Sequence, residues 1–522
     1  QFPRPPRFGK TLFLSTLQAF IERGVDEDER AALFGDLAIW HDPAARAHMG
    51  RYPVVGMTFK DIKYDDWPAC LEAVARVLSE VFLAHRDTIR PALGDIEAEV
   101  FDAVAERRAS PVMLAGSLQF LTRILHRHHG ERAVLLVDEY DTPIHAGYAH
   151  GYYDQAIELF RNLLSGGFKD NAHLQKGVLT GILRVAKESI FSGLNNLDVF
   201  SILRSEHAAS FGFTEPEVAS LAVAAGAEAH LDTLRDWYNG YVFGGQVIYN
   251  PWSVLKFLDD ADKRPQPHWV STSSDDVLHS LIAGGRLGSL SDQEALLRGE
   301  AVERDIIEPI ALRDIERRAD AAVSLLLFSG YLTATEVEYG GRRLRARLRI
   351  PNREVLGVYE TTVLDWLDTG LSSENAVDGM LQALLAGDAD RVERDLERLL
   401  LQHVSHHDLP RPAGELPYHM FVLGLLVRLA PEYDVRSNRE TGFGRADVLI
   451  APRQPGRPGV VMELKTLDPR RDASPEAALD AAMRQIEQRA YAAELATAGA
   501  APIHVYAAVF DGKRAYLRAR TA

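Results

Sequence analysis

The sequence predicts a multidomain α/β protein whose first part contains a parallel sheet covered by helices. Apolar runs without helical spacing, typical of strands buried on both faces, occur at residues 52–59, 133–138 and 176–184. Long helical segments separate these runs, and strands joined through helices usually run parallel. At 522 residues the chain is long enough for about three domains of roughly 100 to 200 residues each.

Composition limits the partners and the compartment that we expect. The formal charge of −16 argues against wholesale electrostatic binding to nucleic acid but is compatible with a local basic groove. The single cysteine, Cys70, rules out an intramolecular disulfide framework and favours the reducing cytoplasm, where we expect it to be a small core residue. Because no apolar run approaches the roughly 20 residues of a membrane span, we expect no membrane partner.

A phosphate-binding loop is predicted at the start of the chain. Residues 4–11, RPPRFGKT, end in the Gly-Lys-Thr of such a loop, and a helical segment follows. Backbone N–H groups at the helix start would hold phosphates, Lys10 would reach the outer ones, and Thr11 would ligate Mg²⁺. Arg4 stands where the usual loop has its first glycine. Only three residues precede the motif, too few for the strand that normally leads into it, so we expect an N-terminal segment to be missing from this sequence.

Two carboxylates follow the strand predicted at 133–138. Asp138 and Glu139 lie at the edge where nucleotide-hydrolysing sheets place their chemistry. Asp138 would hold Mg²⁺, and Glu139 would orient or deprotonate the attacking water. Arg184, just past the next strand, lies where such sheets place a residue that contacts the γ-phosphate. The alternatives are strand carboxylates without a catalytic role and a surface arginine that begins a helix.

The middle of the chain is predicted to be mainly helical and then to form a basic hairpin. The aromatic residues of 237–258 favour a packed core over a base-stacking platform. A helix entering a strand at 315–333 and a hairpin at 335–350 outline a winged helix. On the second arm of the hairpin, apolar residues alternate with four arginines, Arg343, Arg345, Arg347 and Arg349. This cationic face would follow a nucleic-acid backbone, or it is an edge strand protected by charge, or it pairs with acidic neighbours.

A metal-nuclease site is predicted in the last domain. Two strands about a Pro/Gly turn occupy 442–467, with Asp447 in the first strand and Glu463 and Lys465 on one face of the second. Such a hairpin would bring the two carboxylates together, where they repel unless a divalent cation binds between them. Lys465 would position the nucleophile or offset developing charge. Gln485, on the helix that follows, would orient the site, and the alternative is a structural salt bridge.

The succession of motifs resembles a bacterial and archaeal family that joins an AAA-ATPase-like domain to a C-terminal PD-(D/E)XK nuclease domain. The motifs that carry this resemblance are, in order, RPPRFGKT, VDEYDTPI, GILRVAKESIFSGLNN, YNPWSVL, LLLFSGYLT, IPNREV, SNRETGFGRADVLI and MELK. It implies an AAA-like P-loop domain at 1–204, a helical lid at 205–301, a winged-helix-like or helical linking region at 302–404, and a restriction-endonuclease-like α/β core at 405–522.

The resemblance also assigns site residues by position, to which Arg7 and Phe8 of the loop and Arg184 after the strand are added. Those for ATP binding are Arg7, Phe8, Gly9, Lys10, Thr11, Asp138 and Arg184; those for catalysis are Glu139, Asp447, Glu463, Lys465 and Gln485; and those for metal are Thr11, Asp138, Glu415, Asp447 and Glu463. The family's loop also has arginine at the position of Arg4. It usually has a second arginine where this chain has Pro6, and a proline removes a backbone donor beside the phosphates.

These patterns lead to one main hypothesis and two alternatives. The main hypothesis is a protein that binds and hydrolyses ATP and uses Mg²⁺ to cleave nucleic acid, with DNA as the expected substrate, in its C-terminal domain. One alternative is a non-catalytic, NTP-dependent switch or scaffold with degenerate sites. The other is a nucleic-acid-binding module whose basic hairpin serves a partner nuclease. A homo-oligomer is left open, because AAA-type hydrolysis often borrows an arginine from a neighbouring subunit.

Overall fold

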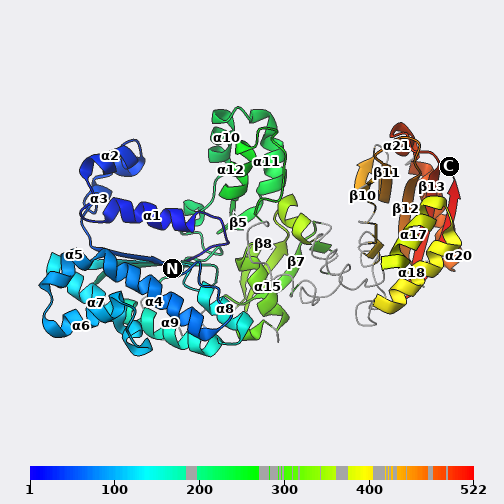
Figure 1. Ribbon diagram of the computed structural model, residues 1–522. Helices are drawn as coiled ribbons and strands as arrows, with labels where there is room; N and C mark the ends of the chain where they lie inside the picture. Colours follow the sequence, from blue (N-terminus) through cyan, green and yellow to red (C-terminus); the bar gives the residue numbers. More distant parts are fainter. Residues whose placement is uncertain are drawn as a thin grey trace. The chain divides into compact units, whose positions relative to one another are not determined.

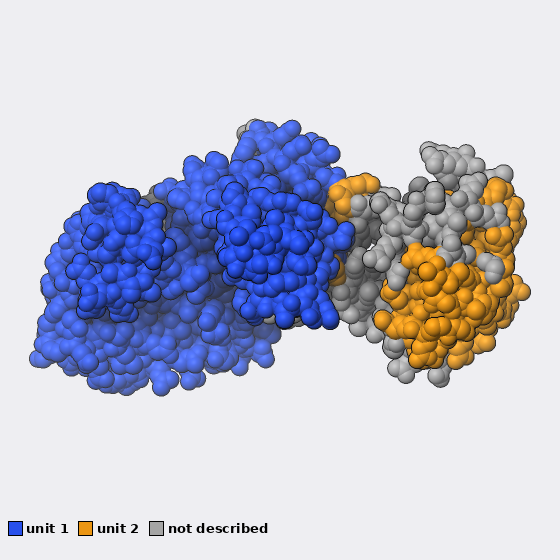
Figure 2. All heavy atoms as spheres, turned by 90° about the horizontal axis from the view of Figure 1, so that it is seen from above, with its two compact units in different colours: residues 1–277, 301–356 blue, residues 278–300, 357–522 orange. Residues whose placement is uncertain are grey.

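The chain folds into two compact units. The computed structural model describes residues 1–183, 197–269, 281, 292, 295–296, 299–308, 310–315, 318–340, 343–359, 374–403, 418, 421–422, 425–426, 429, 432–441, 444–467, 474–489 and 492–521. The first unit comprises residues 1–277 and 301–356, and the second comprises 278–300 and 357–522 (Figure 2). The division at 356 falls inside the linking region expected at 302–404.

A parallel sheet forms the centre of the first unit, as the sequence predicts. Its strand order is β1 (Phe2–Pro3), β4 (Leu174–Gly181), β3 (Ala133–Asp138) and β2 (Val54–Thr58), and all three pairings are parallel. Every residue of β3 is buried, which explains its continuous apolar sequence. A strand does precede the phosphate-binding loop, since Phe2 and Pro3 pair with Thr180 and Gly181. Phe2 and Pro3 thus form a two-residue strand directly before the loop.

Helices cover both faces of this sheet (Figure 1). Helix α1 packs Leu14 and Phe20 against Val134 and Leu136 on one face, and α4, α7 and α9 lie on the other face. The helices of this part are α1 (Lys10–Ile21), α2 (Glu27–Phe34), η1 (Ala38–His41), α3 (Pro43–Arg46), α4 (Trp67–Ala84), α5 (Arg86–Ile89), η2 (Arg90–Ala92), α6 (Asp95–Ala105), α7 (Pro111–His129), α8 (Thr142–His150) and α9 (Tyr153–Phe168). Cys70 is buried in α4, as expected for a core residue.

The segment after β4 is helical with one short hairpin. Its elements are η3 (Ala208–Ser210), α10 (Glu215–Ala224), η4 (Glu228–His230), α11 (Leu231–Tyr238), β5 (Tyr241–Phe243), β6 (Gln246–Ile248) and α12 (Pro251–Asp259). Asn250 begins α12 by accepting the N–H groups of Trp252 and Ser253. Tyr238, Tyr241 and Tyr249 are at most 1% exposed, so this aromatic cluster is core, as predicted.

The predicted basic hairpin is present in the first unit. Strands β8 (Thr333–Gly340) and β9 (Arg343–Arg349) pair antiparallel, after η6 (Leu312–Asp314) and α15 (Ala319–Phe328). A third strand, β7 (Val302–Ile306), pairs with the other side of β9, which gives the order β7-β9-β8. The arginine-bearing strand is therefore central, so the alternative of a charge-protected edge strand is wrong.

The second unit is built on a mixed sheet with a separate core on each face. The strand order is β10 (Tyr433–Thr441), β11 (Gly444–Pro452), β12 (Gly459–Thr466), β13 (Ile503–Asp511) and β14 (Arg514–Thr521), and only β12 and β13 pair in parallel. One face packs on α17 (Glu374–Ala386) and α18 (Ala389–His403). The other packs on α20 (Pro475–Arg489) and α21 (Ala492–Thr497). Among the helices that the structure describes, none is long and apolar enough to cross a membrane.

Candidate nucleotide and nuclease sites

The predicted phosphate-binding loop curves so that its backbone N–H groups can converge. Gly9 lies at the start of α1 with a left-handed φ of 82°. Arg7 is also left-handed, with a φ of 66°, whereas Phe8 between them is not. Such alternation turns successive N–H groups toward one point and is typical of anion-binding backbone. Together with the N-terminus of α1, the loop can therefore hold phosphate oxygens.

Lys10 lies inside the curve of this loop. The residue is 4% exposed, and its Nζ donates to the carbonyl oxygens of Arg4 and Pro5, at 3.1 Å each. The same Nζ lies 3.2 Å from Oε1 of Glu139. Glu139 has a left-handed φ of 52°, a strained backbone for a non-glycine residue and one that is common at functional sites. The structure thus brings Lys10 and Glu139 together at the edge of the sheet.

Asp138 is buried and held by three threonines. Its Oδ2 accepts from Thr11 Oγ1 at 2.6 Å and from Thr58 Oγ1 at 3.4 Å, and its Oδ1 accepts from Thr180 Oγ1 at 2.5 Å. The structure therefore places the two expected Mg²⁺ ligands of this site, Thr11 and Asp138, in direct contact. Sequence reasoning missed Thr58 and Thr180. Thr58 ends β2 and Thr180 is the penultimate residue of β4, the two strands on either side of β3, and only the strand order could have identified them.

Asp141 links the loop after β3 to the end of β4. Its Oδ2 accepts the N–H groups of Ile182 and Leu183, at 2.8 and 2.9 Å. Burial acts to raise the pKa of this carboxyl, but hydrogen bonds from His145 and the two backbone N–H groups outweigh burial and lower it. Asp141 thus fixes the residues directly before Arg184. Arg184 itself lies outside the described residues.

Arg4 anchors the loop to residues 200–243 of the following segment. It is fully buried, donates to the carbonyl oxygens of Phe200 and His207 at 2.5 and 3.1 Å, and lies over the rings of Phe211 and Phe243. Burial lowers the pKa of its guanidinium to about 10. The arginine that replaces the usual glycine is therefore a structural anchor.

The side chains of Arg7 and Phe8, both expected near ATP, contact the helical segment. Phe8 is 1% exposed and packs on Tyr241 and Phe243, with ring centroids 5.0 and 5.1 Å away. The Arg7 guanidinium lies 4.5 Å from the ring of Trp252, and burial lowers its pKa. Of these two residues, the backbone N–H groups are therefore the parts best placed for phosphate.

The two predicted nuclease carboxylates lie on neighbouring strands. Val448 of β11 pairs with Met462 of β12 at the end of their ladder, and the same register continued by one residue places Asp447 opposite Glu463. Asp447 Oδ2 also accepts the N–H of Leu464, at 2.8 Å. Because directly opposite residues of an antiparallel pair share a face, this register puts the two carboxylates on the same face of the sheet.

Gln485 joins the remaining two residues of this site. From α20, its Nε2 donates to Oε1 of Glu463, and its Oε1 accepts from Lys465 Nζ at 3.0 Å. Glu463 is 3% exposed. Within the described residues, no three His, Cys, Asp or Glu side chains gather as a metal site, and Glu415 lies outside those residues. The two carboxylates nevertheless form an all-oxygen donor pair that suits a hard cation such as Mg²⁺.

The arginine face of β9 is bordered by acidic residues on both sides. Arg345 lies opposite Asp305 of β7 and Glu338 of β8, and Arg347 lies opposite Glu303 and Glu336. Ion pairs form from Arg343 and Arg345 to Asp305 at 3.0 and 3.5 Å, and from Arg347 to Glu336 at 3.5 Å. These contacts favour the interpretation that the cationic face pairs with acidic neighbours over the one in which it follows nucleic acid.

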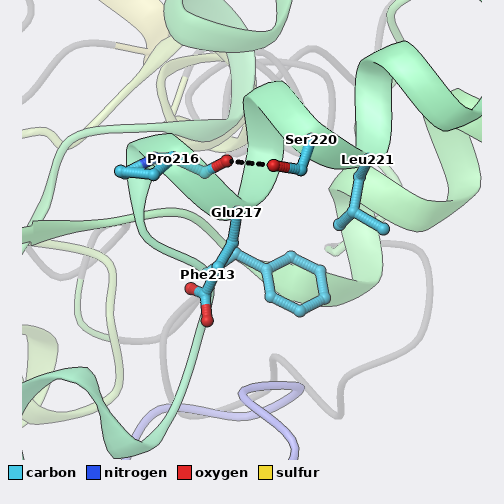
Figure 3. A pocket seen from close by; sticks show the side chains of 5 residues that line it. All are labelled: Phe213, Pro216, Glu217, Ser220 and Leu221. Carbon is cyan, nitrogen blue, oxygen red and sulfur yellow. Dashed lines mark hydrogen bonds between the residues drawn. The ribbon is translucent and has the colours of Figure 1, made fainter.

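A hollow of about 390 Å³ on α10 is a further candidate site (Figure 3). Phe213, Pro216 and Leu221 make its lining mainly apolar. Its two polar side chains are already engaged, since Glu217 accepts from the N–H and hydroxyl of Thr214 and Ser220 donates to the Pro216 carbonyl. The hollow therefore offers little with which to recognise a charged ligand.

Comparison with known families agrees with this geometry. Residues 1–191 match a family described as predicted AAA-ATPase, and residues 413–519 match the PD-(D/E)XK nuclease superfamily. The chain joins an AAA-ATPase-like domain to a PD-(D/E)XK nuclease domain. The resemblance inferred from the motifs is thus confirmed, and the two domain families indicate ATPase and nuclease activity.

One relative is similar to this chain over most of its length. A protein of Azotobacter chroococcum mcd 1, described as an uncharacterized protein in the vnfD 5' region, is 28% identical over 457 residues, which cover 86% of this chain and 79% of the relative. No solved structure is significantly similar. The AAA-ATPase-like match contains Lys10 and Asp138 and ends before α10, and the nuclease match contains Asp447, Glu463 and Lys465.

Proposed function

We propose that the chain binds and hydrolyses ATP with Mg²⁺ in its AAA-ATPase-like domain and cleaves nucleic acid, in the first instance DNA, with Mg²⁺ in its nuclease domain. One observation carries the nuclease half. Gln485 of α20 links Glu463 and Lys465 of β12 in a continuous hydrogen-bonded line, next to the strand β11 that carries Asp447. A structural salt bridge would need only two of these groups.

Each residue of the nuclease site has a distinct role in this proposal. Asp447 and Glu463 would hold Mg²⁺, which supplies Lewis-acid activation of the phosphodiester and of water when bound. The Lys465 ammonium would offset the negative charge that develops on the phosphate. Gln485 fixes the orientation of both Glu463 and Lys465, because its amide contacts each of them.

The roles in the nucleotide site follow from the geometry of the loop. Backbone N–H groups from Arg7 to Thr11 would hold the phosphates, and Lys10 would neutralise their charge. Thr11 and Asp138 would hold Mg²⁺. Glu139 would orient the attacking water once the Lys10 ammonium contacts phosphate, since the two side chains now pair with each other.

A specific observation also favours a second candidate function, the non-catalytic NTP switch. Pro5 and Pro6 lack the N–H groups that other residues would supply to the loop, which weakens the case for tight phosphate binding. Calorimetry with ATP and Mg²⁺ combined with a phosphate-release assay separates the two candidates. Binding without phosphate release or nucleic-acid cleavage would favour the switch.

The proposed function is tested by incubating the full-length chain with labelled DNA and RNA, with and without Mg²⁺ and ATP. We expect Mg²⁺-dependent cleavage that Asp447→Ala and Lys465→Ala abolish, while calorimetric ATP binding stays unchanged. Matched controls are Asp480→Ala, an exposed aspartate of α20, and Lys513→Ala, in the turn between β13 and β14. Cleavage retained by both site variants would contradict the proposal.

A further inference from the structure

A buried tryptophan, which is not part of the phosphate-binding loop, donates a hydrogen bond to the loop backbone. The indole Nε1 of Trp269 donates to the carbonyl oxygen of Pro6 at 3.1 Å. Trp269 is fully buried, and its ring packs on Tyr331, with centroids 4.7 Å apart and planes at 56°. Pro6 directly precedes Arg7, whose left-handed backbone begins the turn of the N–H groups. Trp269 therefore contacts the loop at the point where its curvature starts.

A buried carboxylate fixes Trp269 in turn. Glu354 is fully buried, and its Oε1 accepts the backbone N–H of Trp269 at 2.8 Å. Both of its oxygens accept from the hydroxyl of Ser253 in α12, at 2.9 Å each. Burial raises the pKa of this carboxyl to about 7. Glu354 thus ties the start of α12 and the Trp269 backbone to the segment that follows β9.

The segment after α15 also approaches the loop directly. Gly330 has a left-handed φ of 89°, and a Cβ there would lie 2.9 Å from Cβ of Pro5. A larger residue at this position would push the loop away or strain the backbone. The prolines of the loop are therefore packed against the Gly330–Tyr331 turn and against Trp269.

We infer that Trp269, held by Glu354, is a positioning residue of the nucleotide site. Its indole N–H fixes the Pro6 carbonyl and thereby the orientation of the N–H groups from Arg7 onward that would hold phosphates. This inference rests on the proposed ATP binding. It also extends beyond the family matches, because Trp269 and Glu354 both lie between residues 191 and 413, where the two matches end and begin.

The two prolines explain why the loop needs such an anchor. A loop with N–H groups at residues 5 and 6 could be fixed by its own hydrogen bonds, but Pro5 and Pro6 have none to donate. Their carbonyl groups remain, and each is used here. The Pro5 carbonyl accepts from Lys10 inside the loop, and the Pro6 carbonyl accepts from Trp269 outside it.

Trp269→Phe tests the inference, because phenylalanine keeps an aromatic ring against Tyr331 but removes the N–H donor. We expect the Kd for ATP with Mg²⁺, measured by calorimetry, to rise about tenfold, the effect of one buried hydrogen bond. Trp237→Phe is the matched control. It makes the same change at a half-buried tryptophan of α11 and should leave the Kd unchanged.

Two changes at Glu354 test the second part of the inference. Glu354→Gln keeps an oxygen for the Trp269 N–H, so its ATP affinity should stay close to that of the wild type, whereas Glu354→Ala should weaken binding as Trp269→Phe does. If Glu354→Ala fails to fold, as judged by circular dichroism, Trp269→Phe decides. Unchanged ATP affinity of Trp269→Phe would overturn the inference alone. No ATP binding by the wild-type chain would overturn the proposed function as well.

Discussion

Gln485 is expected to orient other residues of the nuclease site without taking part in the reaction itself. Its amide holds Glu463 and Lys465 at once, so Gln485→Ala should leave both groups present but misoriented. We expect DNA cleavage to fall about 10- to 100-fold, as for other residues that orient metal ligands. Cleavage rates across a Mg²⁺ titration measure the effect. Arg484→Ala, an exposed neighbour on α20, is the control, and equal rates for both variants would show that Gln485 is dispensable.

Glu354 should make the first unit less stable as pH rises. Burial raises the pKa of its carboxyl from 4.5 to about 7, so the protonated form is the one that the fold favours. The stabilisation of the folded state by the protonated carboxyl is complete below about pH 4.5 and is lost as pH increases through about 7. At about 1.4 kcal/mol for each unit of pKa change, the loss is on the order of 3 kcal/mol.

A comparison of Tm between wild type and Glu354→Gln isolates this contribution. Glutamine cannot ionise, so the variant should gain stability relative to the wild type as pH rises from about 4.5 to about 7. Other titrating groups are common to both chains and cancel in the difference. A Tm difference that does not change with pH would show that Glu354 stays in one protonation state.

The sequence identifies residues that belong to a contiguous motif better than residues that only the fold brings together. Lys10, Thr11 and Asp138 follow from their motifs, and the structure places them at one sheet edge. The role of Arg4 as an anchor could not be predicted, because its partners Phe200 and His207 lie about 200 positions away. Trp269 was missed for the same reason, since its contact with Pro6 spans 263 positions.

At the scale of elements, the β9 strand tests whether its arginines bind nucleic acid. Arg345 and Arg347 each lie between two acidic residues of the flanking strands. Arg345→Gln with Arg347→Gln should therefore leave DNA affinity and its salt dependence unchanged. The variant should lose stability, at most about 1 kcal/mol for each ion pair removed. Filter binding across a salt series and Tm measure the two effects, and weaker binding with a flatter salt dependence would support a nucleic-acid role.

The hairpin also shows why the order of strands in a sheet is harder to predict from sequence than the positions of the strands along the chain. Alternation along 343–350 and the glycines at 340 and 341 predict the hairpin, and β8 and β9 confirm it. The neighbour β7, VERDI, carries three charges in five residues and gives no apolar signal. Its pairing depends on charges of β9 that lie some 40 positions later, which local pattern does not reveal. The central position of β9 therefore emerged only from the fold.

At the scale of the whole molecule, the chain alternates between the two units. Residues 278–300 belong to the second unit and 301–356 return to the first, so the chain passes between the units three times. The sequence predicted domains as consecutive blocks. The return of residues 301–356 brings Tyr331 and Glu354 to the Trp269 anchor.

Because each unit has its own buried core, calorimetry of the full chain should show two unfolding transitions. Leu121→Ala, in α7, should lower only the first unit's transition, and Leu399→Ala, in α18, only the second. Both leucines are fully buried, so each substitution should lower the free energy of unfolding of its own unit by about 2 to 5 kcal/mol. ATP with Mg²⁺ at 100 times its Kd should stabilise only the unit that Leu121→Ala destabilises. Its free energy of unfolding should increase by about 2.7 kcal/mol, so that its transition moves to a higher temperature. A single transition moved equally by both variants would show that the units unfold together.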